Sequence, residues 1–518
     1  MKDLIFIYGP PASGKSTVGK LIAEGLGLPF TDLDTKIEEK TQQSIPQIFS
    51  AGGEAGFRSI EKRILQEFIS EGNGVCALGG GALTNPDCLE LVCAAGPVIC
   101  LMASYDSLSS RLANMKRGER PLLSLQLETQ LRHLLASRTN HYASFSQIID
   151  TDGQSPPQVA WEAQTLLGRF HLCQGGQISD IRTLKGMDDI GKAMHSYHDA
   201  GSQIAIVTDD HVGPLYAVRI VKSLRTEGFE AGVIQIPSGE DHKTLSTVAY
   251  LWDEFIRLKL ERKSLVIALG GGVVSDVTGF AAATFLRGIP WAVVPTTLLA
   301  VVDASIGGKT GIDLNQGKNL VGSFHFPRQV LVSSDALASL PIEEFRNGLA
   351  EVVKHGVIGD PALFEICKQG EGYIQANFLR VILRAIAVKT AIVQIDPFEA
   401  NRRAQLNFGH TIGHGLEVLS NFTLRHGEAV SIGMVVETAL AERIGLARPG
   451  LKDEIAKVLD AIGLPTSLPS GLAIDSLIGA MQMDKKRSGG VVHFSLPVEI
   501  GEVKAGIEID HLPDKLAL

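Results

Sequence analysis

Residues 4–16, LIFIYGPPASGKS, combine a short apolar run with a glycine-rich turn that ends in a Lys-Ser pair. Gly9–Ser16 fits the pattern GxxxxGK[ST], and it follows a predicted strand and precedes a predicted helix, as the motif requires. Backbone N–H groups at the start of such a helix bind phosphates. The stretch therefore predicts an α/β domain that binds a nucleoside triphosphate with Mg²⁺ through Gly9, Pro10, Pro11, Ala12, Ser13, Gly14, Lys15, Ser16 and Thr17.

The whole chain has the composition of a globular protein. It has 518 residues, 45% hydrophobic and 20% charged, which is enough for roughly three domains of about 150 residues each. A net charge of -9 argues against a nucleic-acid binder. We find no signal peptide and no apolar run long enough for a membrane span, so we expect a cytoplasmic protein without membrane or nucleic-acid partners. The six cysteines form no CxxC pair, and we expect reduced, buried thiols.

A second glycine-rich start follows an apolar run at residues 264–280, SLVIALGGGVVSDVTGF. Residues 168–177 lack periodicity, and we place a domain boundary there. After about residue 335 helical patterns dominate, as in LAEVVKHGVI and VILRAIAVKTAIVQI. We therefore predict α/β domains over 1–170 and 171–335 and a mainly α-helical domain over 336–518.

Further polar residues in the first domain are candidates for an acceptor site. Asp32 and Asp34 are two apart, which would put both on one side of an extended segment; one could serve Mg²⁺ and the other a substrate hydroxyl. A solvated acidic turn is the alternative. Arg58 and Glu61 are i, i+3 neighbours that can pair on a helix. The remaining candidates are the glycines Gly79, Gly80 and Gly81, a basic lid-like loop around Arg120, and Arg138.

In this order, the motifs GPPASGKS, DLD, GEAGFR, GGG, RPLL and the later arginine resemble shikimate kinase over residues 1 to about 168. The resemblance implies that shikimate is held by Asp34, Arg58, Gly80 and Arg138. It also implies that Ser16 and Asp32 serve Mg²⁺, and that Lys15 and the lid residue Arg120 assist phosphoryl transfer from ATP. Arginines for a carboxylate and an aspartate for hydroxyls suit such an acceptor.

Basic residues in the rest of the chain lie among apolar and glycine-rich segments. Arg287, Lys309, Lys318 and Lys354 are of this kind, and together they favour a phosphorylated or carboxylated ligand, although each alone fits a surface charge. The run GGGVVSDVTGF is not GxGxxG, so by itself it indicates a dinucleotide site only weakly.

Glu351, His410, His414 and His426 are candidate metal ligands, since catalytic zinc takes three His or carboxylate ligands and keeps one position open. In LNFGHTIGHG, residues 406–415, His410 and His414 share one helix face. The spacing suggests that they pair, as in HExxH helices, but Thr411 stands where that motif has Glu.

Residues from about 175 to 518 resemble 3-dehydroquinate synthase through PSGEDHKT, GGGVVSD, PTTLLAVVDASIGGK, GKN, LAEVVKHG, LNFGHTIGH and HGEAV. The resemblance implies a site for Zn²⁺, with Co²⁺ as the alternative ion, made by Glu351, His410 and His426, with His414 facing the substrate. It implies an NAD site of Asp209, Glu240, Lys243, Gly271, Gly272, Asp276, Thr296, Thr297, Lys309 and Lys318. It implies a substrate site of Arg287, Asp303, Lys309, Asn319, Lys354, Lys389, Arg403, Asn407, His414 and Lys485, in which Lys309, Lys354, His414 and Arg403 assist catalysis.

Together the two resemblances imply a bifunctional α/β enzyme: a P-loop kinase domain with a parallel sheet, then a synthase with a Rossmann-like domain and an α-helical domain. The implied reactions are phosphorylation of shikimate and conversion of 3-deoxy-D-arabino-heptulosonate 7-phosphate to 3-dehydroquinate, with phosphate release and NAD⁺ regenerated within the cycle. A homodimer through the synthase part is possible.

Several points stay open. A metal-dependent polyol dehydrogenase similar to glycerol dehydrogenase is the alternative for the second part. A non-catalytic role, with one of the two halves a regulatory or docking module, is the other alternative. His211 stands where the synthase family commonly has asparagine, which puts that adenosine contact in doubt. Either Lys485 or Lys486 could contact substrate.

Overall fold

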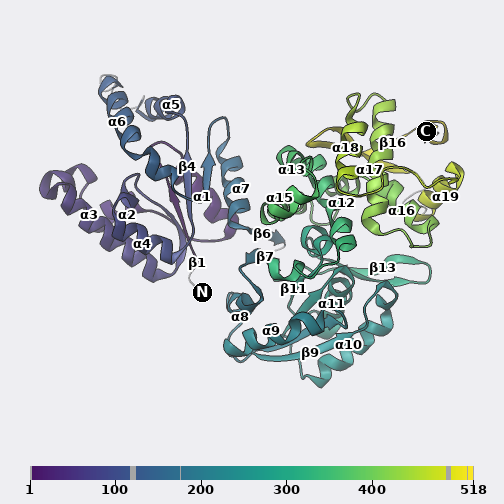
Figure 1. The fold of residues 1–518 in the computed structure, drawn as a ribbon. Coiled ribbons are helices and arrows are strands. Elements are labelled where there is room, and N and C mark those ends of the chain that lie inside the picture. Colours follow the sequence, from purple (N-terminus) through teal and green to yellow (C-terminus); the bar gives the residue numbers. More distant parts are fainter. Residues whose placement is uncertain (1–2, 117–123, 175–176, 486–491, 510, 517–518) are drawn as a thin grey trace. The chain divides into compact units, whose positions relative to one another are not determined.

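The computed structural model describes residues 3–116, 124–174, 177–485, 492–509 and 511–516 (Figure 1). The chain divides into two compact units, Met1–His171 and Leu172–Leu518. Of the helices that the structure describes, none is both long and apolar enough to cross a bilayer.

The first unit is built on a five-stranded parallel sheet, as the P-loop start predicts. Its strands are β1 (Asp3–Tyr8), β2 (Phe30–Asp32), β3 (Asn73–Ala77), β4 (Val98–Met102) and β5 (Ile148–Asp150), in the order β2-β3-β1-β4-β5. The apolar run of the P-loop stretch is the central strand β1. A central parallel strand is covered on both faces, which explains why this run is almost continuously hydrophobic.

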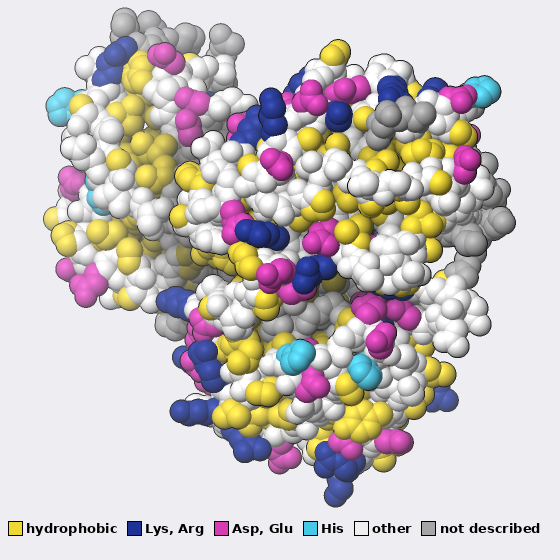
Figure 2. Space-filling model, turned by 45° about the vertical axis from the view of Figure 1, so that its right-hand side comes forward, with side chains coloured by type: hydrophobic (Ala, Val, Ile, Leu, Met, Phe, Trp, Pro, Cys, Tyr) yellow, Lys and Arg dark blue, Asp and Glu magenta, His cyan; other side chains and the backbone are white. Residues whose placement is uncertain are grey.

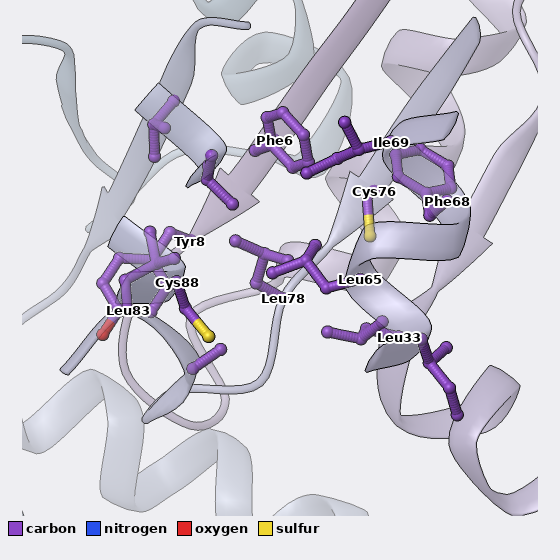
Figure 3. Packing of buried hydrophobic residues seen from close by; sticks show 14 of the residues in the cluster. Phe6, Tyr8, Leu33, Leu65, Phe68, Ile69, Cys76, Leu78, Leu83 and Cys88 are labelled. Atoms are coloured by element: carbon purple, nitrogen blue, oxygen red, sulfur yellow. The ribbon is translucent and has the colours of Figure 1, made fainter. Parts of the chain in front are cut away.

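Helices cover both faces of this sheet. They are α1 (Lys15–Leu26), α2 (Leu33–Thr41), α3 (Ile45–Glu71), α4 (Pro86–Ala95), α5 (Tyr105–Lys116), α6 (Ser124–Ala143) and α7 (Pro156–Leu167). Because side chains alternate along a strand, Phe6 and Tyr8 enter the core on one face, and Ile5 and Ile7 the core on the other. Figure 3 shows the first of these cores, where Phe6 meets Phe68 edge-to-face with ring centroids 6.0 Å apart.

The second unit starts with a seven-stranded sheet in the order β6-β7-β14-β11-β10-β8-β9. The strands are β6 (Arg169–Gln174), β7 (Gln177–Leu184), β8 (Gln203–Asp209), β9 (Glu230–Ile236), β10 (Leu265–Gly270), β11 (Trp291–Pro295) and β14 (Gln329–Ser333). From β7 to β9 the neighbouring strands are parallel. The crossover helices are α8 (Ile190–Met194), α9 (Gly213–Thr226), α10 (Leu245–Arg257) and α11 (Gly272–Thr284). This arrangement confirms the expected Rossmann-like domain.

Helices dominate the remainder, as expected. They are α12 (Ile342–Gly359), α13 (Pro361–Cys367), α14 (Glu371–Ala376), α15 (Phe378–Ile395), α16 (His410–Leu419), α17 (His426–Arg443), α18 (Leu451–Ala461), α19 (Ile474–Lys485) and α20 (Leu512–Leu516). One antiparallel hairpin, β15 (His493–Glu499) with β16 (Glu502–Glu508), belongs to this part. Another, β12 (Lys309–Leu314) with β13 (Gly317–Phe324), lies between β11 and β14 in the chain and packs against α11. The helices α12 and α16 both pack against α17 (Figure 1).

Two expectations need correction. Asp32 and Asp34 do not share an extended segment, because β2 ends at Asp32 and Asp34 lies in the first turn of α2. All six cysteines are free, but Cys93 and Cys173 are exposed rather than buried.

The face of the molecule in Figure 2 carries acidic and basic side chains interspersed, without a large patch of one sign.

Candidate functional sites

The first site forms where three neighbouring strands end. β2, β3 and β1 are adjacent and parallel, so their carboxyl ends lie at one edge of the sheet. Asp32 ends β2, Gly79–Gly81 follow β3, and the P-loop follows β1. Ligands of open α/β sheets bind at this edge. The topology therefore brings together the candidate nucleotide and acceptor residues, which the sequence places far apart.

The P-loop bends through left-handed backbone at Gly9, Ala12 and Gly14, and α1 begins at Lys15. The Lys15 Nζ donates to the Pro10 carbonyl over 2.8 Å. Ser16 Oγ donates to Asp32 Oδ2 over 2.5 Å, which puts the two proposed Mg²⁺ residues in direct contact. Burial lowers the pKa of Lys15 to about 8, although Asp34 and Asp32 favour its charged form.

Two arginines meet the glycine run on the acceptor side. Arg58 Nη1 donates to the buried Glu61 over 2.6 Å, as the i, i+3 spacing predicts. A Cβ on Gly81 would lie 2.5 Å from Arg58 Nη2 and 3.0 Å from Arg138 Nη1. Asp34 is next to the same run, since a Cβ on Gly79 would lie 3.0 Å from its Oδ1. The guanidinium groups of Arg58 and Arg138 and the carboxylate of Asp34 therefore all lie beside the Gly79–Gly81 turn.

The carbonyl of Gly80 is held by three donors. Arg138 Nη1, Tyr142 Oη and Tyr8 Oη donate to it over 3.1, 2.6 and 3.3 Å. Sequence reasoning missed both tyrosines, because neither Tyr8 at the end of an apolar strand nor Tyr142 in a helix gives a signal beyond core packing. Arg120 lies outside the described residues, so its lid role stays a prediction.

The nucleotide candidates of the second unit gather at the carboxyl edge of its sheet. Asp209 ends β8, Gly271 follows β10, and Thr296 follows β11. Asp209 Oδ1 accepts the backbone N–H groups of His211 and Val212 over 2.9 and 2.7 Å and so fixes the turn into α9. Thr297 packs against Gly271, where a Cβ would lie 3.1 Å from its Cγ2. The glycine run begins α11 and points its helix N-terminus to this edge.

Lys243 is buried between two partners at this edge. Its Nζ lies 2.6 Å from Asp276 Oδ2 and donates to Asn319 Oδ1 over 2.5 Å. Burial raises the pKa of Asp276 to about 6 despite the adjacent lysine. Glu240 and Lys318 form a looser pair, 3.6 Å apart. The structure thus joins the GEDHK loop, α11 and β13.

Three candidate metal ligands converge from three helices. Glu351 of α12, His410 at the start of α16 and His426 at the start of α17 offer ligand atoms that all lie within 4.8 Å of one another. Glu351 Oε1 is 3.4 Å from His410 Nε2 and 3.5 Å from His426 Nε2, and this buried oxygen has no hydrogen-bond partner among the described residues. Two imidazoles and a carboxylate suit Zn²⁺ or Co²⁺. These residues fit a metal ion.

The pKa values around Glu351 follow from its burial and its neighbours. Burial alone would raise the pKa of Glu351, but Lys354, which contacts it, and the two histidines hold that pKa well below its usual range. Burial and Lys354 lower the pKa of His410. The pKa of His426 is raised to about 10, because Glu351 and Glu417 outweigh its burial.

A second buried pair lies beside this cluster. Lys389 Nζ donates to Asp303 Oδ1 over 2.5 Å, and His355 Nε2 is 3.8 Å from the same oxygen. Burial lowers the pKa of Lys389 to about 8. Asp303, Glu351 and His355 also have side-chain atoms within 4.8 Å of one another. His355 was not among the candidates, because a histidine within a buried helix reads as core.

Two of the substrate candidates, Asn407 and His414, line a pocket of about 610 Å³ together with the candidate metal ligand His410. The buried Arg403 donates to the carbonyls of Pro397 and Gly307 over 2.5 and 3.3 Å. Lys309 pairs with Glu399, which also accepts from Asn407 over 3.3 Å. Glu399 is a further residue that sequence reasoning missed.

Arg287 and Lys485 are the last two substrate candidates, and only the position of Arg287 can be compared with this pocket. Arg287 is exposed in the turn between α11 and β11. Because α11 runs from the carboxyl end of β10 to the amino end of β11, this turn lies at the sheet edge opposite to the glycine run. Lys485 ends α19 with a side chain that the structure does not describe, and Lys486 lies outside the described residues.

His410 and His414 occupy one face of α16, with ring centroids 5.3 Å apart. His410 and His426 are 5.2 Å apart, whereas His414 and His426 are 6.3 Å apart. His414 lines the pocket with His410, and among the described residues it groups with Glu417 and His426 rather than with Glu351. The geometry therefore separates the two histidines of LNFGHTIGHG.

Three family models match the chain. Residues 11–167 match shikimate kinase, 233–347 the N-terminal part of 3-dehydroquinate synthase, and 348–487 its C-terminal part. A 3-dehydroquinate synthase of Synechococcus is 46% identical over 311 residues, which are 59% of this chain and 84% of that relative.

Solved structures resemble the second unit. A 2-epi-5-epi-valiolone synthase from Streptomyces hygroscopicus with NAD⁺ and Zn²⁺ bound is 27% identical, with TM-score 0.59, covering 65% of this chain and 94% of that one. A 2-deoxy-scyllo-inosose synthase complexed with carbaglucose-6-phosphate, NAD⁺ and Co²⁺ shares the fold at 24% identity, with TM-score 0.61, covering 67% and 98%.

The folds and sites define an enzyme with a P-loop phosphotransferase domain followed by a lyase. The chain belongs to the 3-dehydroquinate synthase family, and its first unit is a shikimate kinase domain. Relatives at 42–46% identity are 3-dehydroquinate synthases, which argues against the polyol dehydrogenase alternative for the second unit.

Proposed function

We propose that the two reactions occur at the two sites described, with the residues in the following roles. In the kinase unit, Gly9–Thr17 bind the phosphates of ATP, and Lys15 contacts the transferred group. Ser16 and Asp32, which already contact each other, hold Mg²⁺. Positioning and charge neutralisation supply most of the catalysis in phosphoryl transfer.

Arg58 and Arg138 bind the carboxylate of shikimate, and Asp34 binds its hydroxyls beside the P-loop. The fixed Gly79–Gly81 turn supports this, because both guanidinium groups lie next to Gly81 and Asp34 next to Gly79. Glu61 holds Arg58 in place through its 2.6 Å hydrogen bond. The family resemblance alone assigns the lid role to Arg120, which lies outside the described residues.

In the synthase unit, Glu351, His410 and His426 hold Zn²⁺ or Co²⁺, and the carboxyl edge of the sheet holds NAD⁺. When bound, the metal supplies a Lewis acid for a substrate oxygen and NAD⁺ a reversible hydride acceptor. Lys243, Asp276 and Asn319 connect the nucleotide side to the substrate side. The convergence of the three ligands next to the pocket is the observation that carries this proposal.

The phosphate and carboxylate of 3-deoxy-D-arabino-heptulosonate 7-phosphate are bound by Lys309, Lys354, Lys389, Arg403 and Asn407. Several of these cations already balance a carboxylate, as Lys389 does with Asp303. An anionic substrate would replace or share such partners, so charges are not left buried and unpaired. His414 donates or accepts a proton near the substrate.

Assays on the full chain test this assignment. ADP release with shikimate and ATP should require Mg²⁺, whereas phosphate release from 3-deoxy-D-arabino-heptulosonate 7-phosphate should require NAD⁺ and a transition metal. A strong zinc chelator should abolish only the second activity, and Zn²⁺ should restore it. Net NADH production with a polyol would instead support a dehydrogenase. A homodimer through the second unit and a cytoplasmic location stay predictions.

A further inference from the structure

Glu417 is a buried carboxylate in contact with a proposed metal ligand. It lies on α16, where His410, His414 and Glu417 follow the i, i+4, i+7 spacing of one helix face. That face meets the start of α17, and Glu417 Oε1 lies 3.0 Å from His426 Nδ1. Its position is therefore set by the same two helices that bring the histidines together.

The contact determines which ring nitrogen of His426 carries the hydrogen and which one is left for a metal. An ionised carboxylate only accepts hydrogen bonds, so Nδ1 carries the hydrogen and donates it to Glu417. The other nitrogen, Nε2, is the atom that faces Glu351 Oε1 at 3.5 Å. We propose that Glu417 is a positioning residue that holds Nδ1–H of His426, so that the Nε2 lone pair is free for the metal; this rests on the proposed metal site.

The two proposed histidine ligands are held by acceptors of different strength. His410 Nδ1 is 3.2 Å from the backbone carbonyl of Phe408, which is neutral. His426 Nδ1 faces a carboxylate, which orients the ring more strongly and makes it a more basic ligand. Loss of such a partner typically weakens metal binding by about 10–100-fold.

His414, Glu417 and His426 also have side-chain atoms within 4.8 Å of one another. A second metal ion could in principle use this group, but His426 would then have to give both ring nitrogens to cations. The 3.0 Å separation fits a hydrogen bond with one proton between Nδ1 and the carboxylate. The positioning role is therefore the better account of the group.

The test is a competition between the full chain and a chromophoric chelator for Zn²⁺, in excess Mg²⁺. The wild type should bind one zinc ion, and Glu417→Gln, which keeps the size but removes the charge, should bind one zinc ion about 10–100-fold more weakly. Glu428→Gln is the matched control, since Glu428 caps the same start of α17 through the Arg425 N–H, 2.9 Å away, and does not contact the ring. This control should leave zinc affinity nearly unchanged.

Two further measurements distinguish a positioning role of Glu417 from a general destabilisation of the helical region. The visible absorption of the Co²⁺ form should change in Glu417→Gln and not in Glu428→Gln. In a double-mutant cycle, Glu417→Gln should add little loss of affinity to His426→Ala, because Glu417 acts through that ring. Equal zinc affinity in Glu417→Gln and wild type, additive losses, or two bound zinc ions in the wild type would each overturn the inference. A wild type that binds no zinc would overturn the proposed metal site itself.

Discussion

Gly433 of α17 lies so close to Gly409 that a Cβ on Gly433 would overlap the carbonyl oxygen of Gly409. Gly409 has a left-handed backbone, with φ +81°, and immediately precedes His410. Its N–H donates over 2.7 Å to the buried Glu437, which also accepts from Ile412 N over 3.0 Å. This contact fixes the start of the helix that carries both pocket histidines.

Gly433→Ala should therefore displace α16 from α17. Overpacking of a tight contact costs about 1–3 kcal/mol, and here the shift moves His410 relative to His426. We expect weaker zinc binding and at least tenfold lower synthase activity, with unchanged shikimate kinase activity. Gly479→Ala is the control, since nothing lies within 4 Å of a Cβ there. Similar zinc affinity in both variants would contradict the prediction.

Gly81→Ala should impair use of shikimate more than use of ATP. The added methyl group would lie 2.5 Å from Arg58 Nη2 and 3.0 Å from Arg138 Nη1, so both side chains must move. Loss of one charge-assisted hydrogen bond, about 1.5–3 kcal/mol, predicts roughly a tenfold or larger rise in KM for shikimate. Steady-state kinetics on each substrate, with Gly56→Ala as control, measure this. An equal rise for ATP would argue against these arginines as acceptor residues.

His410→Ala and His414→Ala should fail in different ways. Removing His410 takes away a proposed ligand, so zinc should be lost or held far more weakly. Removing His414 should leave zinc bound but reduce turnover by about 10²–10⁴-fold, the usual worth of general acid–base help. Metal analysis of the two purified variants decides between them. Equal metal loss in both would mean that the i, i+4 pair is the ligand set.

Binding of Mg-ATP should take up a proton at mildly alkaline pH. Burial lowers the pKa of Lys15 to about 8, so the free protein has lost much of that charge at about pH 8.5. Bound phosphates favour the charged amine and raise its pKa, so a proton enters on binding; at about pH 6.5 the amine is already charged and none is needed. Calorimetry in buffers of different ionisation enthalpy measures this uptake. The same uptake in Lys15→Met would assign it to another group.

Sequence patterns predicted the elements whose geometry is local. The P-loop start, the helix over LAEVVKHGVI and the Arg58–Glu61 pair were predictable because strand–turn–helix order and i, i+3 spacing need only neighbouring residues. The proposed ligand set needed the family resemblance. Spacing alone favoured His410 with His414, whereas Glu351 and His426 reach the same place from other helices.

Residues that support the site from a distance gave no usable pattern. Glu417 and Glu437 each lie in a helical stretch where a carboxylate reads as an ordinary surface charge, yet both are buried against the start of another helix. The prediction that Asp34 lies on an extended segment was wrong, because a two-residue spacing does not reveal where a strand ends. β2 ends at Asp32, and the Asp32 side chain caps α2, in which Asp34 lies. Such errors arise where tertiary packing, not local sequence, decides the partner.

The proposed ligands come from α12, α16 and α17. A bound ion would therefore link Glu351 to His410, which lies 59 residues later in the chain. A ligand that binds only the folded state stabilises it, by about 2.7 kcal/mol at a hundred times its dissociation constant. Resistance of this helical region to heat or proteolysis would then depend on the metal supply. Zinc limitation would then reduce the amount of intact synthase as well as its turnover, whereas the first unit supplies none of the three proposed ligands.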